Sequence, residues 1–333
     1  MKNNIYLVVI LVLIGCTSTK NLIEKDAYFS KENYVAKASG EVVPSDFKFS
    51  NQKSFKVLTW NVEHFVDSFN DPYINSKRED VPDSLMKNKV DDLALALKKI
   101  DADIVVLQEF ESAKFLRSIA DNSLSDMGYK YFADVPSHGW YMNVVLMSKF
   151  PLGVIYGYGN ANTPVLDYKN DKGETETQNN LNTRMWSIEV YPSSNYNFLL
   201  TGVHLKAGRG ERNIAMRKGQ INFLKQQFNR FLKEDKSKNI LVVGDFNSLP
   251  DSEEINLFLK EEKHRKKFID PLPASIMTHT SDEPERRLDY ILINTNMLKE
   301  YEENSAKIPL VFNSNKMREI SDHLPVTATF KIK

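Results

Sequence analysis

Short apolar runs alternate along the chain with segments whose apolar residues recur at helical spacing. The short runs are rich in β-branched and aromatic residues, which predicts buried strands. They are 55–62, 103–110, 129–135, 143–148, 152–158, 185–191, 196–205, 240–244, 288–294 and 324–332. Amphipathic spacing predicts helices over 90–100 and 211–234, and Pro250 followed by acidic residues predicts another over 250–260. This mixed order predicts an α/β fold built on two packed sheets.

The pattern runs from residue 54 to the end of the sequence without a repeat or a linker, so we expect one domain over 54–333. Runs 185–191 and 196–205 flank a turn over Pro192–Ser193–Ser194, which predicts an antiparallel pair. Two polar stretches, 63–82 and 159–183, follow neither period. Insertions of this length are usually functional or disordered.

Composition supports a sizeable core but does not indicate a partner. The 333 residues are 41% hydrophobic and 11% aromatic, and Lys plus Arg equal Asp plus Glu at 44 each. With a formal net charge of zero, a polyanion would have to meet a local basic patch, although most basic clusters are solvated surface. The candidate patches are Lys206 with Arg209 and Arg212, residues 264–267, and Arg286 with Arg287.

The N-terminus has the pattern of an export signal. A lysine precedes an apolar run from Ile5 to Ile14, which is too short to span a bilayer and suits a signal peptide over 1–15. The next letters, "LIGC", resemble the bacterial lipobox, and this would make Cys16 the lipidated first residue of the mature chain. An ordinary signal peptide with a chance cysteine is the alternative. We expect a polar tether over 16–53 and a domain held by lipid on the periplasmic or cell-surface face of a bacterial membrane.

Cys16 is the only cysteine, which excludes a disulfide framework and a cysteine-based metal site.

Polar residues recur where the predicted strands end. Each alone has a structural explanation, as a turn residue, a helix cap or a partner for buried backbone. Together they supply what metal-assisted phosphoryl chemistry needs: oxygen ligands for Mg²⁺ or Mn²⁺, a carboxylate that polarises water, and imidazoles that bind phosphate or move a proton. The residues are Asn61, Glu63, Glu109, His204, Asp245, Asn247, Asp289, Asp322 and His323.

The segments that carry these residues resemble, in order, the motifs of the endonuclease/exonuclease/phosphatase superfamily. They are "TWNVEHF", "DIVVLQEFE", "NVVLMSKFPL", "GVHLKAG", "VVGDFNSLPDS", "RRLDYILI" and "SDHLPVTATF", between about residues 55 and 332. The resemblance implies an α/β (α+β) fold, the four-layer α/β/β/α sandwich of deoxyribonuclease I-like proteins. It also implies an active site at one edge of the paired sheets.

The resemblance further implies which residues bind the metal ion. Asn61 and Glu109 match the amide and the carboxylate of the metal site, and Asp322 matches a further acid beside it. Glu63 stands where AP endonucleases carry an acid and many relatives do not, so it is a fourth metal candidate. The implied cofactor is Mg²⁺ or Mn²⁺.

The catalytic roles follow in the same way. Asp245 resembles the carboxylate that orients the attacking water, and Asn247 the group that stabilises the pentavalent phosphate. His323 resembles the catalytic imidazole, held by Asp289. His204 matches the second histidine of deoxyribonuclease I and sphingomyelinases, but no acid near residues 141–142 matches its usual partner, which leaves that partner unassigned.

The expected activity is that of a Mg²⁺-dependent phosphodiesterase, first of all a nuclease on DNA or RNA. Lys206, Arg209 and Arg212 follow His204 directly and could grip backbone phosphates. Asn143 matches a family position near the scissile phosphate, and core strand polarity explains it equally well.

Two other functions stay open. A phosphoesterase on a lipid or a small substrate is the first, although the motifs of the 5-phosphatases are missing and the stretch 159–183 is too polar for an aromatic docking hairpin. A non-catalytic surface-binding lipoprotein is the second. We expect a monomer without an obligate protein partner.

Overall fold

The computed structural model describes residues 43, 46–135, 139–178, 181, 184–259 and 268–333. The chain divides into two units, Met1–Ser45 and Asp46–Lys333, and everything below concerns the second unit. The expected signal peptide, the lipidation site at Cys16, most of the expected tether and the basic cluster at 264–267 lie outside the described residues.

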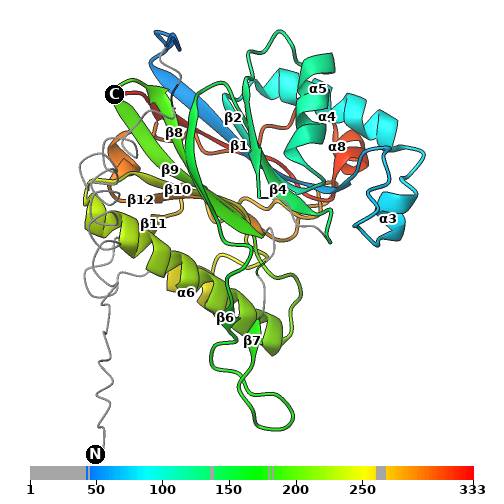
Figure 1. Cartoon of the computed structure of the whole chain (residues 1–333), viewed down its shortest axis with the longest axis vertical. Helices are drawn as coiled ribbons and strands as arrows, with labels where there is room; N and C mark the ends of the chain where they lie inside the picture. The colour runs from blue at the N-terminus through cyan, green and yellow to red at the C-terminus, as the bar shows by residue number, and fades with distance from the viewer. Residues whose placement is uncertain (1–42, 44–45, 136–138, 179–180, 182–183, 260–267) are drawn as a thin grey trace, which may run out of the picture. The chain divides into compact units, whose positions relative to one another are not determined.

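Two mixed sheets form the centre of this unit (Figure 1). The first sheet has the strand order β13-β1-β2-β4-β3 and the second the order β11-β12-β10-β9-β8-β5. The strands of the first sheet are β1 (Ser54–Phe65), β2 (Ile104–Phe110), β3 (Tyr131–Asp134), β4 (Asn143–Ser148) and β13 (Val326–Lys331). Those of the second are β5 (Leu152–Gly157), β8 (Met185–Ser193), β9 (Tyr196–His204), β10 (Ile240–Asp245), β11 (Phe268–Ile269) and β12 (Asp289–Asn294).

Helices cover the outer face of each sheet. The helices α4 (Met86–Ile100), α5 (Ala113–Ser123) and α8 (Ser314–Ile320) pack their apolar faces on β1, β2 and β4 (Figure 1). On the other side, α6 (Glu211–Glu234) and α7 (Glu253–Leu259) pack on β9, β10 and β12. A short helix α3 (Lys77–Asp80) and a 3-10 turn η1 (Met297–Lys299) complete the described helices. The predicted four-layer α/β/β/α sandwich is confirmed.

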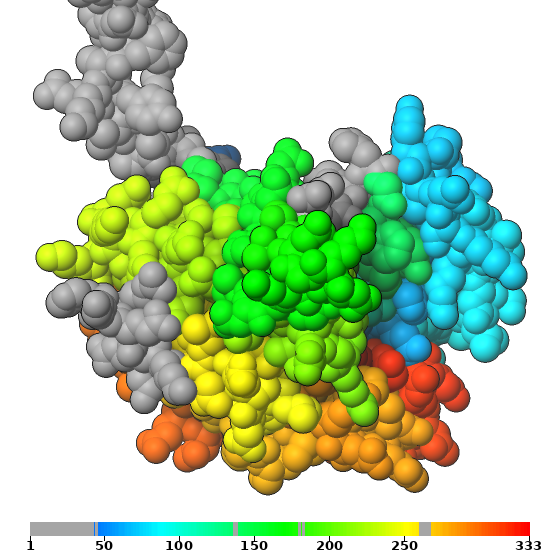
Figure 2. All heavy atoms as spheres, turned by 90° about the horizontal axis from the view of Figure 1, so that it is seen from below, coloured from blue at the N-terminus to red at the C-terminus, as the bar shows by residue number. Residues whose placement is uncertain are grey.

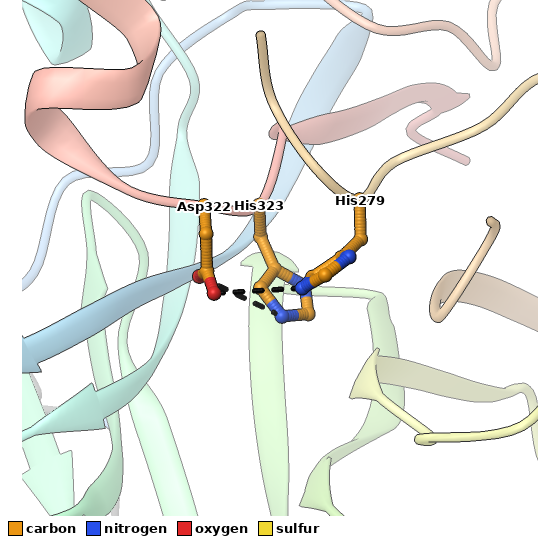
Figure 3. A group of neighbouring side chains, drawn as sticks. All are labelled: His279, Asp322 and His323. Carbon is orange, nitrogen blue, oxygen red and sulfur yellow. Dashed lines mark ion pairs between the residues drawn. The ribbon is translucent and has the colours of Figure 1, made fainter. Parts of the chain in front are cut away.

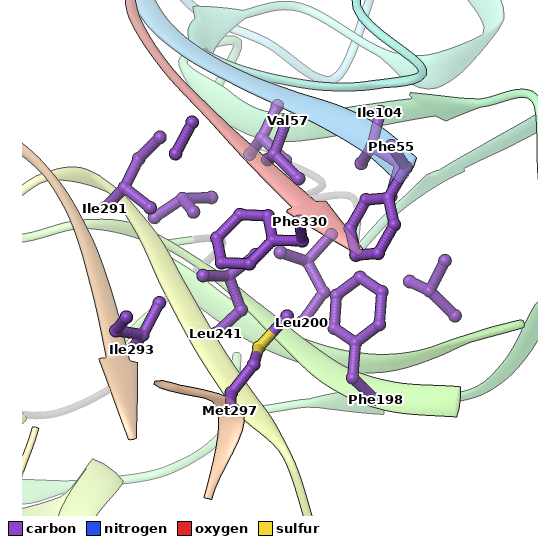
Figure 4. Packing of buried hydrophobic residues seen from close by; sticks show 14 of the residues in the cluster. Phe55, Val57, Ile104, Phe198, Leu200, Leu241, Ile291, Ile293, Met297 and Phe330 are labelled. Atoms are coloured by element: carbon purple, nitrogen blue, oxygen red, sulfur yellow. The ribbon is translucent and has the colours of Figure 1, made fainter. Parts of the chain in front are cut away.

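The main core lies between the two sheets. Alternate residues of each strand point inward, as the two-residue period of a strand requires. Val57 and Ile104 from one sheet face Leu200, Leu241 and Ile291 from the other (Figure 4). Each of these side chains is fully buried, and further along the same rows the buried polar pair Thr59 and Gln108 is joined by a hydrogen bond of 3.1 Å.

The predicted pair 185–191 and 196–205 is confirmed as β8 and β9. The turn lies at Ser194 and Asn195 and begins two residues later than predicted, because the strand continues through Pro192 to Ser193. A register shift between Val190 and Ser193 accommodates the proline, which has no amide hydrogen for a regular ladder.

Other boundaries also differ from the prediction. Helix α4 begins at Met86 rather than at 90, and α7 begins at Glu253 rather than at 250. The described end of the expected tether belongs to the folded unit, because Phe47 packs on Tyr131 with ring centroids 5.9 Å apart.

The two polar stretches also contain structure. In 63–82 the strand β1 continues to Phe65 and α3 follows. The stretch 159–183 contains a hairpin of β6 (Thr163–Pro164) and β7 (Thr177–Gln178). Figure 2 shows the green residues of this hairpin standing out beside the yellow-green helix α6. The hairpin lies so close to α6 that a Cβ on Gly219 would be 2.0 Å from the carbonyl oxygen of Pro164.

Candidate active site

One row of polar residues crosses the second sheet at the end of the core. The strand register places His204 beside Asp245, and Asp245 beside Asp289. The row also includes Arg184, because its carbonyl accepts the His204 amide hydrogen at 2.6 Å and Met185 is paired with Val203. Directly opposed residues share a face. These four side chains therefore continue the rows of the core toward solvent.

The first sheet supplies the opposite wall. Asn61 on β1 donates from Nδ2 to Glu109 Oε1 at 3.2 Å and to Asp245 Oδ2 at 3.1 Å. His204 Nε2 lies 3.7 Å from Glu109 Oε1 and 3.6 Å from Asp245 Oδ2. The partners of His204 that the sequence left unassigned are therefore these two acids, one from each sheet.

His323 completes the centre. Its Nδ1 lies 2.8 Å from Asp289 Oδ2, the contact that the resemblance implies. Its Nε2 lies 3.9 Å from Asp245 Oδ2 and 3.9 Å from Asp322 Oδ1. The imidazole is thus fixed on one side by a buried carboxylate and faces two further acids on the other.

The surroundings shift the pKa values of the two histidines in opposite directions. Burial alone would lower the pKa of His323, but Asp289, Asp245 and Asp322 outweigh it and raise that pKa to about 10. Burial lowers the pKa of His204 and outweighs the opposite effect of Asp245 and Glu109. At neutral pH the metal-free site therefore holds one charged and one neutral imidazole, a division typical of acid–base sites.

The pKa values of the two central acids, Asp245 and Glu109, are also shifted in opposite directions. Burial raises the pKa of Asp245, and the charge of Asp289 adds to this, although His323 and His204 oppose it. Burial also acts to raise the pKa of Glu109, but His204, His64 and the Asn61 amide together hold it below its ordinary range. Glu109 is thus the permanent anion, and Asp245 is the stronger base of the two.

Strained backbone positions lie at this centre. Glu63, His64, Glu109 and Asn247 all have φ between 51° and 57°, in the left-handed region that non-glycine residues rarely adopt. The turn at Asn247 lets its backbone NH donate to Asp245 Oδ1 at 2.8 Å and its Nδ2 donate to Asp245 Oδ2 at 3.2 Å. These contacts fix the amide beside the predicted base.

Gly244 allows the strand that carries Asp245 to approach β9. Its φ is +140°, and a Cβ there would lie 1.9 Å from the carbonyl oxygen of Val203. Only glycine permits this approach.

Among the predicted metal residues, Glu109 and Asp322 fit a hard cation best. Glu109 has no Lys or Arg ion-pair partner among the described residues and contacts only imidazoles and amides. The Asp322 carboxylate is 26% exposed and faces His279 and His323. Carboxylates of this kind are the ligands that Mg²⁺ and Mn²⁺ prefer.

Asn61 and Glu63 are less available. Asn61 presents its nitrogen to the acids, while its Oδ1 accepts from the Glu63 amide at 3.1 Å. Glu63 Oε2 accepts from Arg318 at 2.7 Å and from the Asp322 amide at 3.0 Å. Within the described part of the chain, the clusters of three His, Asp or Glu ligand atoms within 4.8 Å include Asp322 but neither Glu63 nor Glu109. The placement of Glu63 is that of a residue that holds the Asp322 segment.

The predicted substrate-binding cations have different surroundings. Lys206 lies beside the row, next to Arg184, and Arg209 is exposed. Arg212 is bound to Glu176 of the hairpin at 2.6 Å, so its charge is already paired. Asn143 is buried, its Nδ2 donates to the Glu111 carbonyl, and its Oδ1 has no hydrogen-bond partner among the described residues.

Sequence reasoning missed His64, which lies 3.6 Å from Glu109, and three further residues at or near the site. Arg184 lies just before β8, two residues from Trp186 and four from Ile188, which both face inward. The two-residue period of the strand could therefore have placed Arg184 on the inward face. Arg217 is buried, pairs with Glu254 and donates to the carbonyls of Lys206 and Gly208 at 2.8 and 2.7 Å, which holds the cationic loop. His279 lies against Asp322 and His323 and had no local signal.

Comparison with known proteins identifies the family. A model of the Endonuclease/Exonuclease/phosphatase family matches residues 58–323, and the chain belongs to that family. A search of curated proteins found no match.

Solved structures share the fold at low identity. The human Nocturnin catalytic domain with bound sulfate is 19% identical, covers 85% of this chain and 96% of its own, and has a TM-score of 0.55. Truncated TDP2 of Caenorhabditis elegans is 15% identical over 84% and 98%, with a TM-score of 0.54. An endonuclease/exonuclease/phosphatase from Bacteroides vulgatus is 13% identical over 85% and 100%, also at 0.54.

Proposed function

We propose that this protein is a Mg²⁺- or Mn²⁺-dependent phosphodiesterase, and that it is a nuclease acting on DNA or RNA. The observation that carries this proposal is the convergence of Glu109, His204, Asp245 and His323 from both sheets, with two acids and two imidazoles whose pKa values are driven apart. Such a set can bind a phosphate, orient a water molecule and move its proton.

Each residue has a defined part in the hydrolysis. Asp245 orients the attacking water and takes its proton as oxygen bonds to phosphorus, and Asn247 donates to the pentavalent phosphate. The His323 imidazolium and His204 supply hydrogen bonds to the non-bridging oxygens. The bond from phosphorus to the leaving oxygen then breaks, that oxygen takes up a proton from solvent, and Asp245 releases to solvent the proton that it accepted. A divalent ion held by Glu109 and Asp322 would neutralise charge on a phosphate oxygen.

Two cations favour a polyanionic substrate. Arg184 and Lys206 lie close enough that the charge of Arg184 contributes, after burial, to lowering the pKa of Lys206. In the described structure neither has a carboxylate ion-pair partner, although Arg184 is half-buried. Glu109 acts on this guanidinium electrostatically without a direct ion pair, so the guanidinium can still bind a phosphate through two parallel hydrogen bonds. A neighbouring backbone phosphate of a nucleic acid would meet both groups.

A lipid phosphodiester is the second candidate, and an exposed apolar segment favours it. Phe69, Tyr73, Val81 and Leu85 are between 64% and 77% exposed and lie close together in the sequence, beyond the end of β1. Exposed apolar side chains of this size are typical of membrane or protein contacts. The same segment carries several acids, which would oppose binding to an anionic membrane.

A substrate panel separates these possibilities. The full chain would be incubated with Mg²⁺ or Mn²⁺ and plasmid DNA, RNA, bis(p-nitrophenyl) phosphate, sphingomyelin or p-nitrophenyl phosphate. We expect cleavage of nucleic acid that EDTA abolishes and that Asp245→Asn or His323→Ala lowers by about 10²-fold or more without unfolding the protein.

The outcomes are distinct. Hydrolysis of sphingomyelin alone would replace the nuclease by the lipid candidate. Survival of every substrate would favour the surface-binding lipoprotein.

We also propose attachment to a membrane through lipid at Cys16, and a monomer without an obligate protein partner. No helix in the described ranges is long and apolar enough to cross a membrane. Labelling of cells with a clickable fatty acid tests the anchor, and Cys16→Ala should abolish the label.

A further inference from the structure

His279 lies beside the active centre on a hairpin that leads into β12. Its backbone pairs with Arg286, with amide-to-carbonyl distances of 2.9 Å in both directions. Its ring contacts the ring of His323 edge-on, at 4.8 Å between centroids and 78° between planes. Its Nε2 lies 3.4 Å from Asp322 Oδ2, as Figure 3 shows. His279 is therefore fixed by backbone pairing and touches Asp322 and His323, which lie a few residues before β13.

The other ring nitrogen determines where the proton of His279 sits. Arg286 Nη2 lies 2.8 Å from His279 Nδ1. A guanidinium can only donate, so Nδ1 is the acceptor, and the proton of the neutral ring is on Nε2. Asp322 Oδ2 lies 3.4 Å from that nitrogen, and His279 contributes to lowering the pKa of this carboxylate.

His323 has the opposite arrangement. Its Nδ1 faces Asp289, which can only accept when ionised, so Nδ1 carries a proton. The two imidazoles around Asp322 thus have partners of opposite charge on Nδ1. In the neutral state, His323 offers a lone pair at Nε2 and His279 offers a hydrogen-bond donor there.

We propose that His279 is a positioning residue whose Nε2–H aims the Asp322 carboxylate, and that it is not a metal ligand. The ligand atoms of His279, Asp322 and His323 lie within 4.8 Å of one another, as in a metal site. Both nitrogens of His279 are however already used, one by Arg286 and one by Asp322.

Asp322 is held from a second side as well. Its amide donates to Glu63 Oε2 at 3.0 Å, and Arg318 holds the same oxygen at 2.7 Å. With Oδ2 bound to His279, the other oxygen, Oδ1, faces His323 Nε2 at 3.9 Å. The contact with His279 therefore selects which oxygen of Asp322 faces the centre. The expected effect on turnover rests on the proposed function, whereas the expected tautomer of His279 does not depend on it.

Long-range ¹H–¹⁵N correlation on the full chain, labelled with ¹⁵N-histidine and treated with EDTA, tests the tautomer. His279→Phe identifies the resonances of this ring. We expect Nε2 of His279 to be protonated and its Nδ1 unprotonated. Where His323 is neutral, we expect its proton on Nδ1. Arg286→Met should remove the preference of His279. A His279 ring protonated on Nδ1, or one whose Nε2 loses its proton when Mg²⁺ is added, would overturn the proposal.

A variant series tests the consequence for the site. His279→Phe keeps an aromatic ring without a donor, whereas His279→Gln keeps an N–H donor. Loss of such a supporting contact typically costs about 10–100-fold in metal affinity or activity. We expect His279→Phe to raise the Mg²⁺ concentration for half-maximal activity and to lower kcat with little change in KM, and His279→Gln to recover part of both.

Arg117→Gln, which removes an exposed arginine paired with Asp121 on α5, is the control. Wild-type metal dependence and kcat in His279→Phe would refute the positioning role. If no substrate is hydrolysed by any variant, the proposed function fails while the NMR result still decides the tautomer.

Discussion

The contact between Asp289 and His323 is the interaction whose removal has the clearest expected effect. Both side chains are buried and their nearest atoms are 2.8 Å apart. The pKa of His323 is raised from 6.5 to about 10, and each pKa unit corresponds to about 1.4 kcal/mol. The surrounding acids therefore stabilise the imidazolium by roughly 5 kcal/mol in total, net of burial. Asp289 is the strongest of them.

Asp289→Asn keeps the shape of the side chain and removes its charge. The amide can donate to Nδ1, which would move the proton of the neutral ring to Nε2 and reverse the tautomer. We expect the pKa of His323 to fall by several units and kcat for phosphodiester cleavage to fall by about 10²–10⁴-fold. An NMR pH titration of His323 in the metal-free protein measures the first, and steady-state kinetics the second.

The same change affects stability with a defined sign. Because the folded-state pKa of His323 lies above its ordinary value, its contribution to stability is complete below about pH 6.5 and is lost as the pH rises through about 10. Asp289→Asn should therefore weaken the pH dependence of thermal stability between about pH 6.5 and about pH 10. A variant that folds normally, keeps kcat within about tenfold of the wild type and leaves the His323 titration in place would refute this account of the pair.

Three further changes have definite expectations. Arg184→Gln should raise KM for nucleic acid and reduce the salt dependence of binding by about one charge, while KM for bis(p-nitrophenyl) phosphate should change little. Arg212 is already paired, so Arg212→Gln should change neither KM for nucleic acid nor the salt dependence. Burial raises the pKa of Glu111 from 4.5 to about 7, so stability should fall as pH rises through that window, and Glu111→Gln should remove this fall in melting scans. Gly219→Ala would place a Cβ 2.0 Å from the oxygen of Pro164, so proteolysis within the hairpin should accelerate while catalysis at a small substrate persists.

The layered fold was predictable because nearly every strand has a buried apolar run. The runs at 55–62 and 240–244 follow the inward rows of β1 and β10 closely. Element ends were less predictable, since they depend on tertiary contacts. The strand β1 continues to Phe65 because that ring stacks on Phe110, 5.3 Å between centroids, on the outer face of the sheet. No local pattern contains that contact.

The residues of the candidate site were predictable in kind rather than in detail. Strand-end positions such as His204 and Asp245 were indicated by the motifs around them, and the register places them side by side. The orientation of Asn61 and the engagement of Glu63 by Arg318 are set by contacts across more than a hundred residues of sequence. Those contacts decide which atoms are free to bind a metal ion.

His279 shows most clearly what could not be predicted from the sequence, and why this matters for the mechanism. A histidine in the loop before "RRLDYILI" has no periodic signal, and a basic pair beside it suggests only surface charge. The fold divides that pair. Arg287 is buried against Asp270, and Arg286 reaches the Nδ1 of His279. An arginine on one imidazole and an aspartate on the other give the two histidines opposite proton positions within one site. The chemistry of Asp322 between them then depends on Arg286 and Asp289, which set those proton positions and lie outside the motif "SDHLPVTATF" that carries Asp322.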